Sequence, residues 1–269
     1  MSVTRIISIV LLVLSLGLGF YLVNSIKSTI DDQALIAERE SAIINKLMLI
    51  KEAEIAYLEV NGSYTSDWDK LINFIENGKY PIVQKKERVV TLSYGADSSI
   101  VTYDTLDIIS AKDRIFNAAH NVNAANSGTF VEYNIKIGEQ ALKGAPAYTL
   151  NQDGKNVTHK FKENGKVTSR KRFTEGMPIT KGQLMMTIEE TKFDPNVDIS
   201  RLAYVPGYDD VKFDIYAAEI ERSNQLVDVI EVKNPRPFNP ARREDNEAKN
   251  RKPLRFGSKT DVTTSGNWE

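Results

Sequence analysis

The residues best able to do chemistry are few, because the chain has two histidines, His120 and His159, and no cysteine. Two imidazoles could share a metal ion or act as an acid–base pair, since histidine titrates near neutral pH. Each of them, however, lies among polar residues of an expected strand or loop, which is typical of a surface histidine. The lack of cysteine excludes disulfides, thiolate metal sites and cysteine nucleophiles. We therefore expect no catalytic residue, no cofactor and no metal site.

One acidic stretch imitates the first half of a calcium loop, with Asp194, Asn196 and Asp198 at alternate positions. An EF-hand also needs glycine at the sixth place and glutamate at the twelfth. Ile199 and Val205 occupy those places here. The stretch therefore predicts a turn. The sequence also has no P-loop, no GxSxG motif and no dinucleotide-binding glycine set, so no motif identifies a reaction.

The clearest element that could position a domain is the N-terminal apolar segment. Residues 6–26 are 21 residues without a charge. As a helix they would be about 31 Å long, close to the bilayer core of about 30 Å. A secretory signal peptide is the alternative, but its apolar region is shorter and ends at a small-residue cleavage site. Residues 24–27 (Asn-Ser-Ile-Lys) make a poor site, which favours an uncleaved anchor at residues 1–26.

The sequence indicates the orientation of the chain in the membrane less clearly. Arg5 precedes the apolar segment, while Lys27 and Arg39 follow it, so the positive-inside count is nearly balanced. Anchors with a very short basic N-terminal tail usually export the C-terminal part of their chain. We therefore expect a single-pass protein of the inner (cytoplasmic) membrane with an extracytoplasmic C-terminal domain. Its membrane partner would be the lipid around residues 6–26.

A continuous amphipathic helix is predicted beyond the membrane, because residues 25–60 contain neither proline nor glycine. Apolar residues recur about every seven positions and form a stripe along one side. The predicted packing face consists of Ile36, Ile43, Leu47, Ile50 and Tyr57. Such a face packs either on the β-rich domain of the same chain or on neighbouring copies in a bundle of stalks.

The helix is expected to stop at Asn61-Gly62, since both residues tolerate positive φ. Thr65 or Ser66 is expected to cap a short second helix that ends at Gly78. Residues 27–80 are thus predicted to form an amphipathic helix, an elbow and a short second helix.

The elbow carries the pattern A-x-x-x-Y-x-x-x-N-G-x-Y, formed by Ala53, Tyr57, Asn61, Gly62 and Tyr64. With Leu71 further on, it resembles the end of the long N-terminal helix in type IV pilins and type II secretion pseudopilins. In those families the helix leads into an α/β loop and a C-terminal sheet. The resemblance implies a component of a filament, secretion or motility machine. Unlike those families, this chain has no acidic residue inside its apolar segment.

Residues 81–232 predict a β-rich globular domain, because many short strands joined by turns form antiparallel sheets. The strongest hairpin signal is Asn164-Gly165, between strands expected at residues 155–161 and 166–173. Further strands are expected at residues 88–94, 100–103, 130–137, 184–189, 211–220 and 226–232, and a short helix at residues 106–117.

Residues 233–269, here called the C-terminal arm, contain four of the nine prolines and few aliphatic residues. From Lys233 to Lys259 there are nine Lys/Arg against three Asp/Glu. We expect an extended arm that is no domain of its own. It could be a solvated tail or dock on an acidic surface, whereas nucleic acid is not expected because acidic residues dilute the positive charge. The predicted apolar anchors are Phe238, Leu254, Phe256 and Trp268.

The predicted fold is therefore α+β. A single transmembrane helix continues as a long amphipathic helix, followed by an antiparallel β-rich domain and the extended C-terminal arm. The predicted function is that of a non-enzymatic, membrane-anchored structural or assembly protein of the bacterial cell envelope, present as a homo-oligomer or larger assembly. The alternative is a membrane-tethered enzyme or ligand-binding domain whose site no sequence motif reveals.

Overall fold

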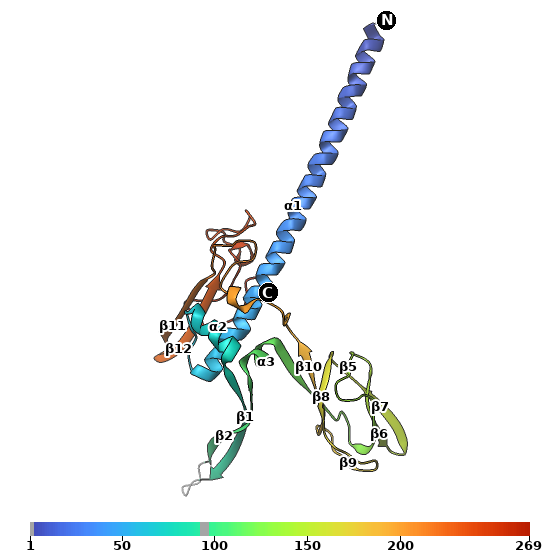
Figure 1. The fold of residues 1–269 in the computed structure, drawn as a ribbon, viewed down its shortest axis with the longest axis vertical. Coiled ribbons are helices and arrows are strands. Elements are labelled where there is room, and N and C mark those ends of the chain that lie inside the picture. Colours follow the sequence, from blue (N-terminus) through green and yellow to red (C-terminus); the bar gives the residue numbers. More distant parts are fainter. Residues whose placement is uncertain (1–2, 92–96) are drawn as a thin grey trace. The chain divides into compact units, whose positions relative to one another are not determined.

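The computed structural model describes the backbone of residues 3–91 and 97–269, and the side chains of residues 11–83, 99 and 101–269. It has the predicted α+β architecture, with a long apolar helix at the N-terminus followed by antiparallel sheets (Figure 1). The chain divides into two compact units. The first comprises Met1–Lys51, Ser63–Ser66 and Arg201–Glu269, and the second comprises Glu52–Gly62 and Asp67–Ser200.

These boundaries differ from those expected from the sequence. The β-rich domain predicted at residues 81–232 is divided between the two units, and residues 233–269 belong to the first of them. The predicted boundary after Val232 followed a change in composition, because prolines and charges become frequent there. In the structure this change in composition falls inside a folded unit.

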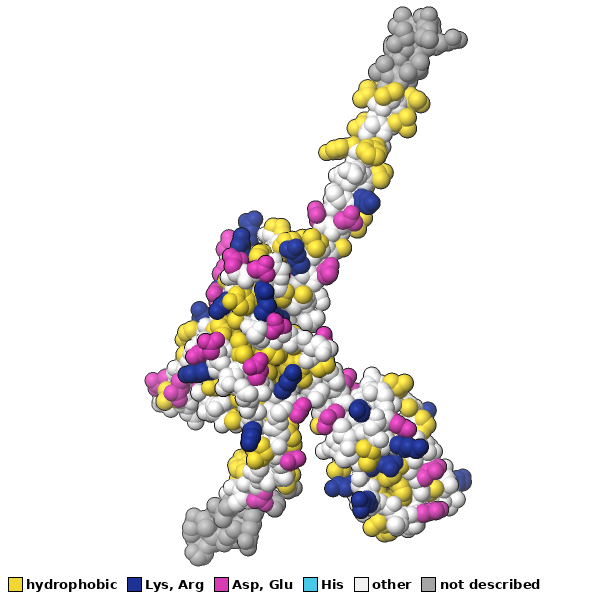
Figure 2. All heavy atoms as spheres, viewed as in Figure 1, with side chains coloured by type: hydrophobic (Ala, Val, Ile, Leu, Met, Phe, Trp, Pro, Cys, Tyr) yellow, Lys and Arg dark blue, Asp and Glu magenta, His cyan; other side chains and the backbone are white. Residues whose placement is uncertain are grey.

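Helix α1 (Val3–Asn61) is continuous, as the lack of proline and glycine over residues 25–60 predicted. Its residues 11–35 are exposed on every side. Within the part of the chain that the structure describes, α1 is the helix long and apolar enough to cross a membrane. Figure 2 shows its first described side chains to be hydrophobic, with charged side chains only further along. The chain therefore has a candidate membrane span, such as an anchor or a signal sequence provides.

The end of α1 is the predicted glycine stop. Gly62 has a φ of 81°, and its N–H donates to the carbonyl of Leu58 at 2.8 Å. Helix α2 (Trp68–Asn77) follows, but its cap is not Thr65 or Ser66. The Asp67 carboxylate accepts the N–H groups of Asp69 and Lys70 at 2.9 and 3.3 Å, because a carboxylate satisfies the free donors of a helix N-terminus well.

The sheet of the first unit has three antiparallel strands in the order β11-β12-β13 (Asp214–Arg222, Gln225–Lys233 and Arg255–Gly257). The strands expected at residues 211–220 and 226–232 are found as β11 and β12, which pair as a hairpin joined by only two residues, Ser223 and Asn224. Both loop residues have positive φ, 53° and 61°, as a two-residue hairpin turn requires. The third strand, β13, comes from the C-terminal arm. A Cβ at Gly257 would collide with the carbonyl oxygen of Ile230, so glycine permits this close pairing.

In the second unit, two long strands follow α2. Strands β1 (Lys79–Thr91) and β2 (Asp97–Ser110) form a two-stranded antiparallel sheet, here called the ribbon. Residues 92–96, which include the end of the strand expected at residues 88–94, lie outside the described residues. The helix expected at residues 106–117 is only α3 (Ala111–Phe116), because β2 extends to Ser110, whose side chain caps α3.

Residues 117–191 form a β-sandwich with its own core. The strands are β3 (Asn117–Asn123), β4 (Gly128–Tyr133), β5 (Gln140–Ala141), β6 (Pro146–Gln152), β7 (Lys155–Lys160), β8 (Gly165–Arg170), β9 (Pro178–Ile179) and β10 (Leu184–Thr191). They make two four-stranded sheets, in the orders β3-β10-β8-β5 and β7-β6-β4-β9. One buried cluster contains side chains of both sheets, among them Phe130, Leu150, Val167 and Ile188.

The sandwich is an internal duplication. Gly128, Gly138 and Gly144 recur as Gly165, Gly176 and Gly182, about 38 residues later in the chain. The two sheets have equivalent strand orders, with β4 corresponding to β8 and β6 to β10. The bonds repeat as well, because the Gly138 N–H donates to Val167 and the Gly176 N–H donates to Phe130, both at 2.8 Å.

The hairpin predicted at Asn164-Gly165 is wrong. Strand β7 pairs with β6, whereas β8 pairs with β10 and β5, so Gly165 lies where the chain crosses from one sheet to the other. It has an extended φ of 159° and not the left-handed φ of a tight turn. A Cβ there would lie 2.9 Å from the Glu189 oxygen, and one at Gly128 would lie 2.7 Å from the Asn151 oxygen. Both glycines therefore allow a neighbouring strand to come close.

The chain enters and leaves the sandwich at adjacent points. Asn117 of β3 pairs with Thr191 of β10, and the Lys192 N–H donates to the Phe116 carbonyl at 2.7 Å. Neighbouring ends and a separate core are the features of an inserted domain. Two short 3₁₀ helices, Ile199–Arg201 and Lys249–Arg251, complete the described elements.

Candidate functional site

The two histidines line one cleft of about 720 Å³ on the sandwich, here called the histidine cleft. His120 comes from β3 and His159 from β7, which belong to different sheets. Three exposed lysines, Lys160, Lys162 and Lys181, also line the cleft. The fold thus brings together residues that no sequence motif connects.

His159 is held by two neighbours. Its ring stacks on Tyr148 with centroids 4.8 Å apart and an interplanar angle of 21°. Its Nε2 lies 3.2 Å from Nε2 of Gln152, within hydrogen-bonding distance. Burial lowers the pKa of His159, which favours the neutral imidazole at physiological pH. A neutral, stacked imidazole bonded to an amide is suited to shaping the cleft wall.

Tyr148 is fixed in turn by backbone groups. Its hydroxyl donates to the Asn123 carbonyl at 3.2 Å and accepts the Ala125 N–H at 3.0 Å. Burial raises the pKa of Tyr148, and the N–H of Ala125 opposes that shift only in part. The phenol therefore stays protonated and acts as a hydrogen-bond bridge in the cleft wall.

The histidine cleft has no evident metal chemistry. His120 Nε2 lies 3.5 Å from a carboxylate oxygen of Glu190, while His159 contacts Tyr148 and Gln152. Over the described residues, no group of three or more His, Asp or Glu could hold a metal ion. The calcium-like stretch is a turn, in which Asp194 accepts the Asn196 N–H at 2.9 Å.

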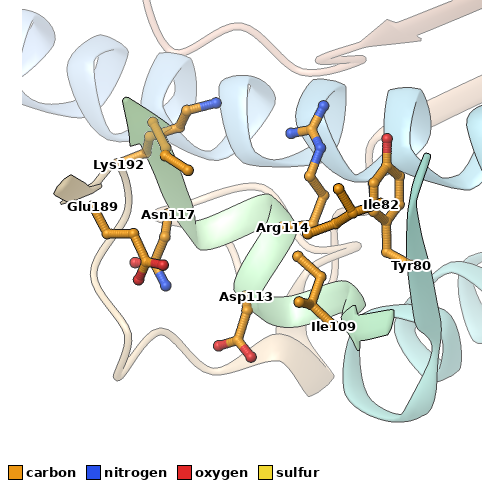
Figure 3. A pocket seen from close by; sticks show the side chains of 10 residues that line it. Tyr80, Ile82, Ile109, Asp113, Arg114, Asn117, Glu189 and Lys192 are labelled. Carbon is orange, nitrogen blue, oxygen red and sulfur yellow. The ribbon is translucent and has the colours of Figure 1, made fainter. Parts of the chain in front are cut away.

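A second cleft, of about 610 Å³, lies beside α3 and the end of β10 (Figure 3). The side-chain ends of Tyr80, Arg114 and Lys192 point towards α1, whereas the carboxylates of Asp113 and Glu189 point away from it. The three groups that could have bound an anion are thus turned to the helix.

On α1 these groups meet two carboxylates. Glu52 accepts Lys192 Nζ at 3.0 Å and lies 3.9 Å from Arg114. Glu59 lies 3.5 Å from Arg114 and accepts the Tyr80 hydroxyl at 2.6 Å. Burial, followed by this bond to Glu59, raises the pKa of Tyr80. We call these five residues the brace, because they tie the ribbon and both ends of the sandwich to α1.

In the first unit, Glu40 of α1 receives polar contacts from two residues of the C-terminal arm. Arg242 donates to both of its carboxylate oxygens, from Nε at 2.6 Å and from Nη2 at 3.1 Å. Asn239 adds a bond at 2.8 Å. A third nitrogen of Arg242 donates to the carbonyls of Asn250 and Lys252 at 2.7 and 3.1 Å. One arginine therefore fastens the C-terminal arm both to the helix and to itself.

The predicted residues of the helix are found at different depths. Ile43, Leu47 and Ile50 are buried, whereas Ile36 and Tyr57 are half-buried. Tyr57 packs edge-on against Phe74 of α2 with centroids 5.3 Å apart. The periodicity thus marked a stripe whose middle is buried most deeply.

The predicted anchors of the C-terminal arm also differ from one another. Leu254 and Phe256 are buried, and Phe256 lies in β13. Phe238 is half-buried beneath the Arg39 guanidinium, whose central carbon lies 3.9 Å from the ring centroid. Trp268 is half-buried. The arm was expected to dock as an extended segment, but two of its side chains belong to the interior of the first unit.

The Glu40 pair should make the first unit sensitive to acid. Burial would raise the pKa of Glu40, but the bonds from Arg242 and Asn239 and the charge of Arg242 lower it below its usual 4.5. A carboxylate with a lowered folded-state pKa stabilises the protein above its unfolded-state pKa and loses this effect as pH falls through the folded value. We expect the Glu40→Gln variant to be less stable at pH 7 and to lose less stability below pH 4.5.

Thermal unfolding of the full chain in detergent between pH 7 and pH 3 measures this difference. The matched control is Glu38→Gln, which changes an exposed carboxylate on the same helix and should leave the melting temperature at pH 7 unchanged. Equal acid sensitivity of wild type and Glu40→Gln would show that the Glu40 pair does not govern the acid response.

Comparison with known proteins identifies no family for this chain. No protein-family model matches the chain, and no curated protein matches it. Among solved structures, the urea carboxylase of Kluyveromyces lactis is similar to part of it, at 17% sequence identity and a TM-score of 0.25. That match covers 26% of this chain and 6% of the carboxylase chain. A likeness this partial carries no functional argument.

Proposed function

We propose that the chain is a non-enzymatic, membrane-anchored assembly protein of the bacterial cell envelope. The observation that carries this proposal is α1 itself. One unbroken helix provides both the exposed apolar segment and the buried residues Ile43, Leu47 and Ile50 of the first unit. A membrane helix that continues rigidly into a folded unit holds that unit at a fixed distance from the bilayer, which suits a scaffold.

The polar groups of the clefts support a scaffold as well. In the second cleft, Arg114, Lys192 and Tyr80 are engaged by Glu52 and Glu59. In the first unit, Arg242 is engaged by Glu40 and two backbone carbonyls. These contacts join distant parts of the chain, which gives the participating side chains a structural role.

The resemblance to pilins and pseudopilins fits this proposal. A long N-terminal helix, a Gly62 stop, and an antiparallel sheet built from C-terminal residues are the features that the resemblance implies. A role in a filament, secretion or motility machine of the inner membrane, with the folded units on its outer side, is therefore the form of the proposal that we favour.

A ligand-binding role is the second candidate, and the histidine cleft favours it. The cleft combines a stacked Tyr148–His159 pair with three lysines and a single glutamate, Glu163, as its acidic lining residue. An anionic ligand with a flat ring would match that lining. Isothermal titration of the full chain with nucleotides and aromatic carboxylates would test this role.

The particle mass of the full chain in mild detergent tests the main proposal. An assembly protein should give particles well above the 30.2 kDa of one chain plus its detergent. A strict monomer at all concentrations would contradict the assembly function. A monomer that also binds a ligand in the titration would establish the second candidate instead.

Retention of the apolar segment is a separate expectation. Leu14 and Leu18 are 55% and 58% exposed, so a bilayer would surround them. An arginine near the centre of a span costs about 3 kcal/mol on insertion scales. Replacing both Leu14 and Leu18 with arginine should therefore release the protein from membranes that are washed at alkaline pH. The control Leu35→Arg changes a residue beyond the span and should leave the protein in the membrane.

Retention of the segment itself is checked by the intact mass of the mature protein. An N-terminus after residue 20 would contradict an uncleaved anchor.

A further inference from the structure

The ribbon is an unusual surface element, because several of its described apolar side chains are largely exposed. Val83, Val101, Tyr103, Leu106 and Ile108 are 49%, 37%, 65%, 63% and 59% exposed. Figure 2 shows hydrophobic side chains along this described stem. The register places Val83, Val101 and Tyr103 on the same face, since they belong to alternate residue pairs along the ladder.

The backbone of the ribbon is also incomplete as a sheet. Over the described residues, β1 and β2 pair only with each other. Each strand therefore presents one outer edge, and edges of this length are templates for pairing with another strand. Two-stranded ribbons are only marginally stable alone. Pro81 lacks an N–H and lies near the base of β1, so pairing is favoured beyond it, along residues 83–91.

The charges of the two strands are opposite. By sequence, β1 carries Lys79, Lys85, Lys86 and Arg88 against Glu87, whereas β2 carries Asp97, Asp104 and Asp107 with no Lys or Arg. A two-fold axis would place β1 against β1, or β2 against β2, and would bring like charges together. A translation places β1 of one copy against β2 of the next in antiparallel orientation, with opposite charges facing.

We propose that the ribbon joins copies of this chain edge to edge, with the basic β1 of one copy paired to the acidic β2 of the next. Such a contact is head-to-tail and does not close on itself, so it produces open chains of subunits. It would also place the apolar side chains of the ribbon beside those of a neighbour on the same face of the extended sheet. The partner is a second copy of this chain, and the inference rests on the proposed assembly function.

Charge reversal in trans gives the sharpest test. The acidic variant is Lys85→Glu with Lys86→Glu, and the basic variant is Asp104→Lys with Asp107→Lys. In either variant alone, both edges of the ribbon carry the same sign, so self-pairing should fail. In an equimolar mixture, each edge of one variant meets an edge of opposite sign on the other, and assembly should return.

The measurement is the particle-mass distribution of the full chain in mild detergent, by mass photometry and sedimentation. The wild type should form a series of oligomers that grows with concentration and shortens in 1 M salt, where the screening length falls to about 3 Å. Each variant should be monomeric, and the mixture should recover the series. A chain carrying all four substitutions also has edges of opposite sign and should assemble, which shows that the ribbon still folds.

The possible outcomes test the ribbon contact and the assembly function separately. If the single-sign variants keep the wild-type series, the chain assembles through another surface, so the ribbon contact is refuted and the assembly function stands. If the mixture and the four-substitution chain both stay monomeric while the wild type assembles, charge pairing of the edges is refuted. A wild type that is monomeric at every concentration overturns both.

Discussion

Replacing Ile50 with aspartate is expected to lower the free energy of unfolding of the first unit by about 4 kcal/mol. Ile50 has no exposed surface, so the variant loses the burial of a large aliphatic side chain. It also places a carboxylate where no solvent reaches, which must remain charged without a partner or take up a proton. Since whole domains are stable by only about 5–15 kcal/mol, this loss should be visible directly in thermal or urea unfolding.

Met48→Asp is the matched control for this substitution. Met48 lies on the same helix two residues away and is 42% exposed. The same carboxylate there stays hydrated, and the expected change is below about 1 kcal/mol. Equal destabilisation by both variants would point to a loss of helix propensity, and an unchanged melting curve for Ile50→Asp would show that this face is not part of the interior.

The helical part of the fold could be predicted because its signals are local. The continuous α1 follows from the absence of proline and glycine over residues 25–60, and its stop follows from Gly62. The predicted apolar stripe includes Ile43, Leu47 and Ile50, which are all buried. Ile36 and Tyr57 belong to the same stripe but are half-buried, because periodicity identifies the buried side of a helix and not how far along the helix that side is covered.

Strand pairing could not be predicted from turn residues alone. Asn164-Gly165 has the composition of a tight hairpin turn, but the chain crosses there to the other sheet. The signal that would have revealed this is longer in range. Recognition of Gly128 and Gly165 as equivalent positions of a repeat would have placed both glycines at the start of corresponding strands.

The polar contacts were beyond prediction for a related reason. Glu40 and Arg242 are 202 residues apart in the chain, and many other pairs of opposite charge are equally plausible by sequence. The two histidines come from strands of different sheets, so only the paired fold brings them to one cleft. Their types were visible in the sequence, whereas their proximity depends on which strands pair.

Truncation after Val232 is expected to unfold the first unit, in contrast to what composition suggested. The change removes β13, the buried side chains of Leu254 and Phe256, and the Arg242 contacts to Glu40. Loss of one large buried side chain alone costs about 3–5 kcal/mol, so losing the whole arm exceeds the stability of an ordinary domain. Hydrogen exchange, followed by peptide mass spectrometry, should show protection lost across β11 and β12.

The arrangement of the chain provides two controls for this truncation. The sandwich has its own buried core at residues 117–191, so its peptides should keep their protection when those of β11 and β12 lose it. Within the intact arm, Phe256→Ala should reproduce most of the loss because Phe256 is fully buried. Phe238→Ala removes a half-buried ring that lies beneath the Arg39 guanidinium, and it should cost only about 1 kcal/mol. If β11 and β12 stay protected after truncation, the arm only lies on the surface of the unit, and the composition of residues 233–269 was the better guide.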